Sequence, residues 1–142
     1  MLIDEGLELL SEADCRELLS RGGLGRVGIT MGALPVILPV TFAFVDDDIV
    51  FRTGRGTKLN VATTGNIVAF ETDCYDKVEH RGWSVLAVGR ASRVEPGGLR
   101  IDPALLGLKP WDVGSAEYVR IRCEMLSGRR IVPKSELETL PG

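Results

Sequence analysis

The sequence GRVGITMGALPVILPVTFAFVDDDIVFRT, residues 25–53, decides the fold of this chain. No charged side chain lies between Arg26 and Asp46, and an apolar stretch of about 20 residues is long enough for a membrane-spanning helix. The stretch nevertheless contains two interior prolines and many β-branched residues. Interior prolines disfavour a helix, and β-branched residues favour strands. We therefore expect two buried strands, 25–31 and 34–45, joined by a turn, and no membrane span.

Turn-forming residues divide the rest of the chain into short segments. Gly32 at the first central position of its connection suits a type II′ hairpin turn, and aspartates 46–48 suit the next turn because aspartate tolerates turn conformations. Ser11 and Asp14 form a capping-box pattern at a helix start. Further strands are expected at 49–53, 67–73, 83–94 and 117–126, a short segment around Ile131, and helical turns at 11–20, 57–64 and near Pro103.

Six strands with short turns and few helices indicate a mostly β protein. A small antiparallel Greek-key barrel fits this pattern better than a sandwich, because the chain is too short for two large sheets and its helices. The length of 142 residues suits one domain, residues 1–142.

Charge and cysteine content exclude several classes of function. The net charge of −3 gives no general attraction to nucleic acid or to an anionic membrane, so any phosphate site must be a local cluster of cations. The three cysteines, Cys15, Cys74 and Cys123, lie far apart and form no C-x-x-C pair, which argues against a disulfide framework and a zinc site. Reduced thiols and an acidic N-terminus unlike a signal peptide predict a cytoplasmic protein.

The segment FRTGRGTKL, residues 51–59, is the most informative for chemistry, with three cations, two hydroxyl side chains and two glycines. It lies where an expected strand ends and an expected helix begins, and helix starts offer free N–H groups to phosphate. Arginine and lysine bind phosphate, and glycine lets the backbone approach it closely. The spacing matches neither a Walker P-loop nor a Rossmann fingerprint. From the residues alone, a phosphate-binding loop and a solvated basic turn with Thr57 as helix cap both stay open.

Other titratable residues give weaker signals. Glu71 and Asp73 share one face of an expected strand, where they form either an acid–base pair or, as we favour, partners for a nearby arginine. His80 is the only histidine and lies in a charged loop, so we expect it to be exposed. No cluster of carboxylates and histidine suggests a metal, and no catalytic residue can be assigned.

Short motifs follow one another along the chain: Arg26 to Gly28, Pro35 to Phe42, Ile49 to Thr53, Thr57 to Leu59, Val68 to Asp73, Gly82 to Val85, Val88 to Ala91, Val119 to Ile121 and Ser127 to Ile131. In order and spacing they resemble the pyridoxamine 5′-phosphate oxidase-like flavin-binding split-barrel family, in particular its branch near the nitroimidazole reductases. The resemblance covers a core of about residues 11–132. It implies a six-stranded antiparallel split barrel that forms a homodimer, with FMN in a cleft between the subunits.

The resemblance also implies which residues contact the cofactor. The second strand would run along the flavin ring with its backbone, the end of the third strand would approach the ribityl chain and phosphate, and the following helix start would bind the phosphate. A position on the fifth strand would reach the flavin, often from the other subunit. The residues at these places are Pro39, Val40, Thr41, Phe42, Arg52, Thr53, Thr57 and Lys58, with Trp83 and Ser84 on the fifth strand.

The function implied by the resemblance is that of an FMN-binding oxidoreductase acting on a small acceptor, such as a nitroaromatic or a quinone. The alternatives are a deazaflavin-dependent reductase, for which Arg55 is the extra cation facing a longer acidic tail, and a non-catalytic flavin- or haem-binding protein. Oxidation of pyridoxamine phosphate requires a second set of basic groups, and no C-terminal set here matches it. Vitamin B6 synthesis is therefore not predicted.

Overall fold

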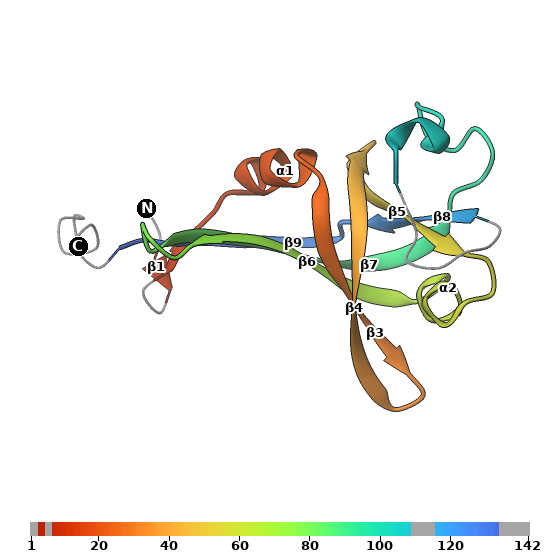
Figure 1. The fold of residues 1–142 in the computed structure, drawn as a ribbon, viewed down its shortest axis with the longest axis horizontal. Coiled ribbons are helices and arrows are strands. Elements are labelled where there is room, and N and C mark those ends of the chain that lie inside the picture. The colour runs from red at the N-terminus through yellow and green to blue at the C-terminus, as the bar shows by residue number, and fades with distance from the viewer. Residues whose placement is uncertain (1–2, 5–6, 109–115, 134–142) are drawn as a thin grey trace.

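A computed structural model describes residues 3–4, 7–108 and 116–133 of the chain (Figure 1). Within them, nine strands form one antiparallel sheet in the order β1-β2-β9-β7-β6-β3-β4-β5-β8. The strands are β1 (Ile3–Asp4), β2 (Leu7–Leu9), β3 (Gly23–Met31), β4 (Leu34–Val45), β5 (Asp48–Gly54), β6 (Ile67–Asp76), β7 (Arg81–Arg93), β8 (Ala116–Arg122) and β9 (Met125–Ile131). The helices are α1 (Glu12–Ser20), α2 (Lys58–Thr63) and the 3₁₀ turn η1 (Pro103–Leu106).

Six of these strands close into a ring. The ring runs β3-β4-β5-β8-β7-β6, and β6 pairs back onto β3. It closes where β8 pairs with the end of β7, at Ala91 opposite Ile121 and Arg93 opposite Val119. The first part of β7 pairs instead with β9, from which β2 and β1 continue the sheet away from the ring (Figure 1). The predicted mostly β, six-stranded antiparallel barrel is therefore confirmed.

The turns and helix starts follow the local sequence. Gly32 has φ 62° in the β3–β4 turn, and Asp46 and Asp47 have φ 54° and 62° in the β4–β5 turn. Such left-handed conformations strain most residues but suit glycine and aspartate. Ser11 caps α1, its hydroxyl accepting a hydrogen bond from the Asp14 N–H at 3.1 Å. These turns and this cap are as predicted.

The C-terminal strands differ from the prediction. A single strand 117–126 was expected, but β8 ends at Arg122 and β9 begins at Met125, with the Glu124 N–H bonded to the Arg122 carbonyl at 2.9 Å. The physical reason lies in β7, because a Cβ on Gly89 would lie 1.6 Å from the Arg122 carbonyl oxygen. The chain passes close to this glycine at the point where the neighbour of β7 changes from β9, beside residues 82–88, to β8, beside residues 91–93. The short strands β1 and β2 were also not predicted.

Strand alternation sorts the side chains into a barrel interior and an outer face. Phe51, Phe70 and Val27 are fully buried inside, and the rings of Phe42 and Phe70 pack edge to face at 4.7 Å. Helix α1 covers one end of this interior with Cys15, Leu18 and Leu19, the face predicted for it. A smaller apolar cluster of Val45, Val50, Leu99 and Leu108 lies between β5 and the segment after β7. Among the residues described, no helix is long and apolar enough to cross a membrane.

Candidate functional site

The loop between β5 and α2 is held in shape by Thr57. Its hydroxyl donates to the Gly54 carbonyl at 2.8 Å and accepts from the Asn60 N–H at 3.2 Å. The same hydroxyl therefore closes the loop and caps α2. Gly56, between them, has φ 76°. The helical cap predicted at Thr57 is present. Since α2 has only six residues, a ligand here depends on the side chains of the loop more than on the helix dipole.

Asn60 is the second residue that holds this loop in shape, and no sequence motif pointed to it. It is 8% exposed, and its Nδ2 donates to the Thr53 hydroxyl at 2.9 Å. Its Oδ1 accepts from the Gly56 N–H at 3.4 Å. The sequence carried no capping-box signal for it, because the residue three positions after the Thr57 cap is asparagine rather than glutamate or glutamine. Thr53 is buried at 2% exposure, and its hydroxyl accepts the hydrogen bond that holds Asn60 in the loop.

Lys58 lies at the wall of a cavity of about 420 Å³. The cavity lies between the β3–β4 hairpin and α2, and is lined by Thr30, Met31, Gly32, Gly56, Lys58, Val61, Ala62 and Asn66. Lys58 is exposed and forms no ion pair with another residue that the structure describes. Its ammonium group is therefore available to an anion that enters the cavity.

Arg55 lies on the other side of the same loop and has a carboxylate partner. Its Nε lies 3.7 Å from Oε2 of Glu117, whose Oε1 lies 3.5 Å from Nε of Arg93. The Glu117 side chain is only 11% exposed, whereas that of Arg55 is 61% exposed. One carboxylate thus serves two arginines, and Arg55 is engaged before any ligand arrives.

Arg52 points to neither side of the loop. Because strand side chains alternate, it lies on the opposite face of β5 from Thr53, opposite Tyr118 of β8. Its Nη1 donates to the Leu108 carbonyl at 3.5 Å, and its buried Nε has no hydrogen-bond partner among the described residues. The structure therefore does not bring Arg52 to the Lys58 cavity.

Residues 39–42 of β4 divide between the two faces of the strand. Val40 and Phe42 are buried in the barrel at 2% and 3% exposure, so only their backbone can meet a ligand. Pro39 is exposed and Thr41 half-buried on the outer face. Pairing with β5 begins only at Phe42, which leaves residues 34–41 with a strand neighbour, β3, on one edge alone among the described strands.

Trp83 and Ser84 lie far from the Lys58 cavity within one chain. They are at the start of β7, opposite Cys74 and Asp73 of β6. Ala91, by contrast, accepts a hydrogen bond from Gly65 just after α2, roughly 25 Å further along the strand. Trp83 is half-buried against the main core, while Ser84 faces outward.

The paired carboxylates belong to an ion cluster on the outer face. Nη1 of Arg26 lies 3.1 Å from Glu71 and 3.5 Å from Asp73, which confirms the interpretation as arginine partners. Burial, then the hydrogen bond and charge of Asp73, raise the pKa of Glu71 to about 7 against the opposing effect of Arg26. His80 is exposed as predicted. The described residues contain no group of histidine, cysteine and carboxylates placed to hold a metal.

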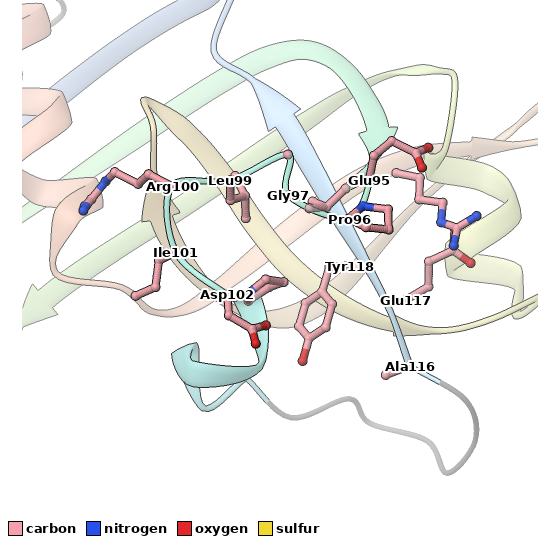
Figure 2. A pocket seen from close by; sticks show the side chains of 14 residues that line it. Glu95, Pro96, Gly97, Leu99, Arg100, Ile101, Asp102, Ala116, Glu117 and Tyr118 are labelled. Atoms are coloured by element: carbon pink, nitrogen blue, oxygen red, sulfur yellow. The ribbon is translucent and has the colours of Figure 1, made fainter.

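A larger cavity of about 540 Å³ adjoins the Arg55 side of the loop (Figure 2). It is enclosed by the segment 93–103 and the first residues of β8. Glu117 and Arg93 lie in its wall, so the ion cluster that engages Arg55 also borders this space. Leu99 and Tyr118 supply apolar surface, and Glu95 and Asp102 supply carboxylates (Figure 2).

Comparison with known proteins identifies the family. The model of the family described as Pyridoxamine 5′-phosphate oxidase matches residues 11–130, and the chain belongs to that family. An uncharacterized protein of Mycobacterium tuberculosis is 34% identical over 143 residues, covering 93% of this chain and 84% of that protein.

Two solved structures are similar over most of their length. The structure of the FAD binding protein from Mycobacterium smegmatis has a TM-score of 0.70 at 34% identity, covering 87% of this chain and 98% of that one. A FAD-binding protein from Mesorhizobium loti has a TM-score of 0.70 at 19% identity, covering 87% and 97% respectively, which shows the fold alone.

Proposed function

We propose that this protein is a flavin-dependent oxidoreductase in which Lys58 binds the phosphate of FMN. The observation that supports this most directly is the position of Lys58, a cation without a partner in the described structure, at the wall of a ligand-sized cavity beside a glycine-containing loop. Its relative from Mycobacterium smegmatis is described as FAD binding, which makes FAD the alternative flavin.

The residues around the cavity fit a flavin phosphate. Lysine binds phosphate as a point charge, and Gly56 leaves the backbone open to close approach. Thr57 and Asn60 fix the loop before binding, so little ordering is required when the phosphate arrives. Arg52 does not belong to this set, since it faces the other side of β5.

The flavin would supply the hydride chemistry, and the chain would supply orientation and exclusion of water. The half-open edge of β4, residues 34–41, offers backbone groups to the polar edge of a flat ring. A small acceptor such as a nitroaromatic or a quinone would react at the exposed face of that ring.

The working form that we propose is a homodimer. A row of outward positions crosses five strands, from Ile37 through Gly28, Ala69 and Val88 to Met125. Ile37 is 71% and Met125 68% exposed, so this apolar surface is open in one chain. Exposed apolar patches of this kind mark association surfaces. A second copy would cover it, and would also offer the distant Trp83 and Ser84 to its partner's flavin.

The test is an absorption spectrum of the purified protein followed by fluorescence titration with FMN and FAD. Wild type should bind FMN, and Lys58→Ala should weaken binding strongly. Lys77→Ala, which removes an exposed lysine from the β6–β7 loop, should bind as wild type. Tighter binding of FAD would replace FMN by the longer flavin. A colourless protein that binds neither would contradict the proposal, and deazaflavin and haem would be titrated next.

Dimerisation is tested separately by light scattering after size-exclusion chromatography. Ile37→Glu should convert a dimer to a monomer, because it places a charge within the apolar row. A wild-type monomer would contradict this part of the proposal without affecting the flavin titration.

A further inference from the structure

Four arginines line one cavity beside β7 and β8, and one of them, Arg93, is already paired with Glu117. The cavity has a volume of about 440 Å³ and is lined by Asp48, Arg90, Ser92, Arg93, Glu95, Gly98, Arg120, Arg122 and Glu124. Ser92 lies directly opposite Arg120 in the β7–β8 ladder, so the outward positions of both strands face the same space. None of these residues lines the Lys58 cavity. We call this surface the arginine basin.

Only part of the positive charge in the arginine basin is neutralised within the described structure. The charge of Arg120 is paired, since its Nε lies 2.7 Å from Asp48, and its Nη1 donates to the Gly98 carbonyl at 2.8 Å. Arg90 donates to the Gly65 carbonyl at 2.9 Å, a neutral acceptor that leaves its charge uncompensated. Arg122 has no ion pair with another described residue, and neither Glu95 nor Glu124 approaches an arginine within ion-pair distance.

Both uncompensated arginines line the same cavity and stand just beyond the end of the β7–β8 ladder. Ala91 pairs with Ile121, and Arg90 and Arg122 are the next residues along their strands. A Cβ on Gly89 would lie 1.6 Å from the Arg122 carbonyl oxygen, so the backbone of Arg122 passes beside the residue that precedes Arg90 in β7. Like charges in one cavity repel each other, and a bound anion would remove that cost. Guanidinium groups match the oxygens of phosphate in pairs, and the Ser92 hydroxyl adds a neutral donor.

We propose that the arginine basin binds a phosphate-bearing small molecule at a second site, independent of the flavin phosphate. Arg90 and Arg122 contact the phosphate oxygens, while Arg120 keeps its ion pair with Asp48. The volume exceeds that of a single phosphate ion, so a diphosphate group or a phosphate ester fits better than the free ion.

Isothermal titration of the full chain with pyrophosphate tests the proposal. Arg122→Gln and Arg90→Gln should each raise the Kd at least fivefold. Arg21→Gln, which removes an exposed arginine at the end of α1, should change it less than twofold. Equal weakening by Arg21→Gln would show non-specific charge attraction and overturn the proposal. Loss of binding in Lys58→Ala would assign pyrophosphate to the flavin loop and also overturn it.

A melting experiment in phosphate-free buffer supplies a second readout. Because Arg122 has no ion pair with a described residue and shares its cavity with the uncompensated Arg90, Arg122→Gln should melt at the same temperature as wild type or higher. Pyrophosphate should then raise the melting temperature of wild type and not that of the variant. A lower melting temperature for unliganded Arg122→Gln would show that stabilising contacts hold Arg122, and would overturn the proposal.

Two further titrations separate this site from the flavin site and identify its ligand. FMN should bind Arg122→Gln as it binds wild type, so failure of flavin binding and failure of the basin are distinguishable. ADP binding more tightly than pyrophosphate at the basin would support a nucleoside diphosphate as the ligand, and equal binding would support recognition of the phosphates alone. Binding of neither, at concentrations up to millimolar, would overturn the proposal.

Discussion

The two sides of the β5–α2 loop differ in one respect, the presence of a carboxylate. On one side Arg55 meets Glu117, which it shares with Arg93. On the other side Lys58 meets an open cavity and no carboxylate of the described chain. Both side chains are exposed cations three residues apart, yet only one is free to hold a phosphate. The number of cations in a loop therefore says less about anion binding than the distribution of nearby carboxylates.

The largest expected effect separates the two sides directly. Lys58→Ala should raise the Kd for FMN about 10- to 100-fold, because a hydrogen bond to a charged group contributes about 1.5–3 kcal/mol. Arg55→Ala should raise it less than about threefold, since Glu117 already engages that side chain. Fluorescence titration of both variants measures the difference. If Arg55→Ala weakened binding more than Lys58→Ala, the phosphate would lie on the paired side.

The next effect concerns Asn60, whose hydrogen bonds hold the loop between the two sides. Asn60→Ala removes the buried donor to Thr53 and the acceptor for Gly56, so the free energy of unfolding should fall by about 1–3 kcal/mol. Asn66→Ala, which loses one exposed hydrogen bond to Ala62, serves as the control and should lose less than about 1 kcal/mol. Urea unfolding measures both. Equal losses would mean that Asn60 does not organise the loop.

A smaller effect should follow when the carboxylate on the Arg55 side is neutralised, because both sides then carry an unpaired cation. Glu117→Gln removes the charge that engages Arg55, so in a Lys58→Ala background it should improve FMN binding by about two- to fivefold, within the modest strength of an ion pair whose arginine is mostly exposed. Glu95→Gln, a carboxylate in the same cavity wall without an ion pair, is the matched control. No gain in the double variant would mean that Arg55 cannot reach the phosphate even when released.

The smallest effect extends the comparison to Arg26, whose carboxylate partner changes charge near neutral pH. The pKa of Glu71 is raised from 4.5 to about 7, so the folded chain keeps a proton that the unfolded chain releases. This contribution to stability is complete below about pH 4.5 and is lost as the pH rises through about 7. Glu71→Gln should therefore flatten the decline in stability between these values, measured by urea unfolding at several pH values. Glu79→Gln, at an exposed loop site, should leave the decline as in wild type.

Much of the barrel could be predicted because its turns are local. Gly32 and the Asp46–Asp47 pair adopt left-handed backbone conformations, and each ends a strand close to the predicted place. The break between β8 and β9 could not be predicted in this way. Residues 122–124 contain neither glycine nor proline, and the glycine that permits the crossing, Gly89, lies on a different strand.

The site was predictable in composition but not in arrangement. The sequence indicated that residues 51–59 form a cation-rich loop, and Thr57 caps its helix as expected. It could not show that Glu117 would neutralise Arg55, because only the β5–β8 register, with Thr53 opposite Glu117, brings them together. Nor could it show that Arg52 faces away, which depends on the face of β5 that turns toward the smaller core cluster.

One edge of β7 pairs with two different strands, which matters for engineering the protein. One strand fixes the register of two neighbours, β8 at residues 91–93 and β9 at residues 82–88. A single inserted residue between these segments would shift one pairing against the other and turn one set of side chains to the wrong face. The exposed β6–β7 connection, residues 77–80, carries no such double constraint. Peptide tags and fluorescent labels should therefore be tolerated there and rejected within β7.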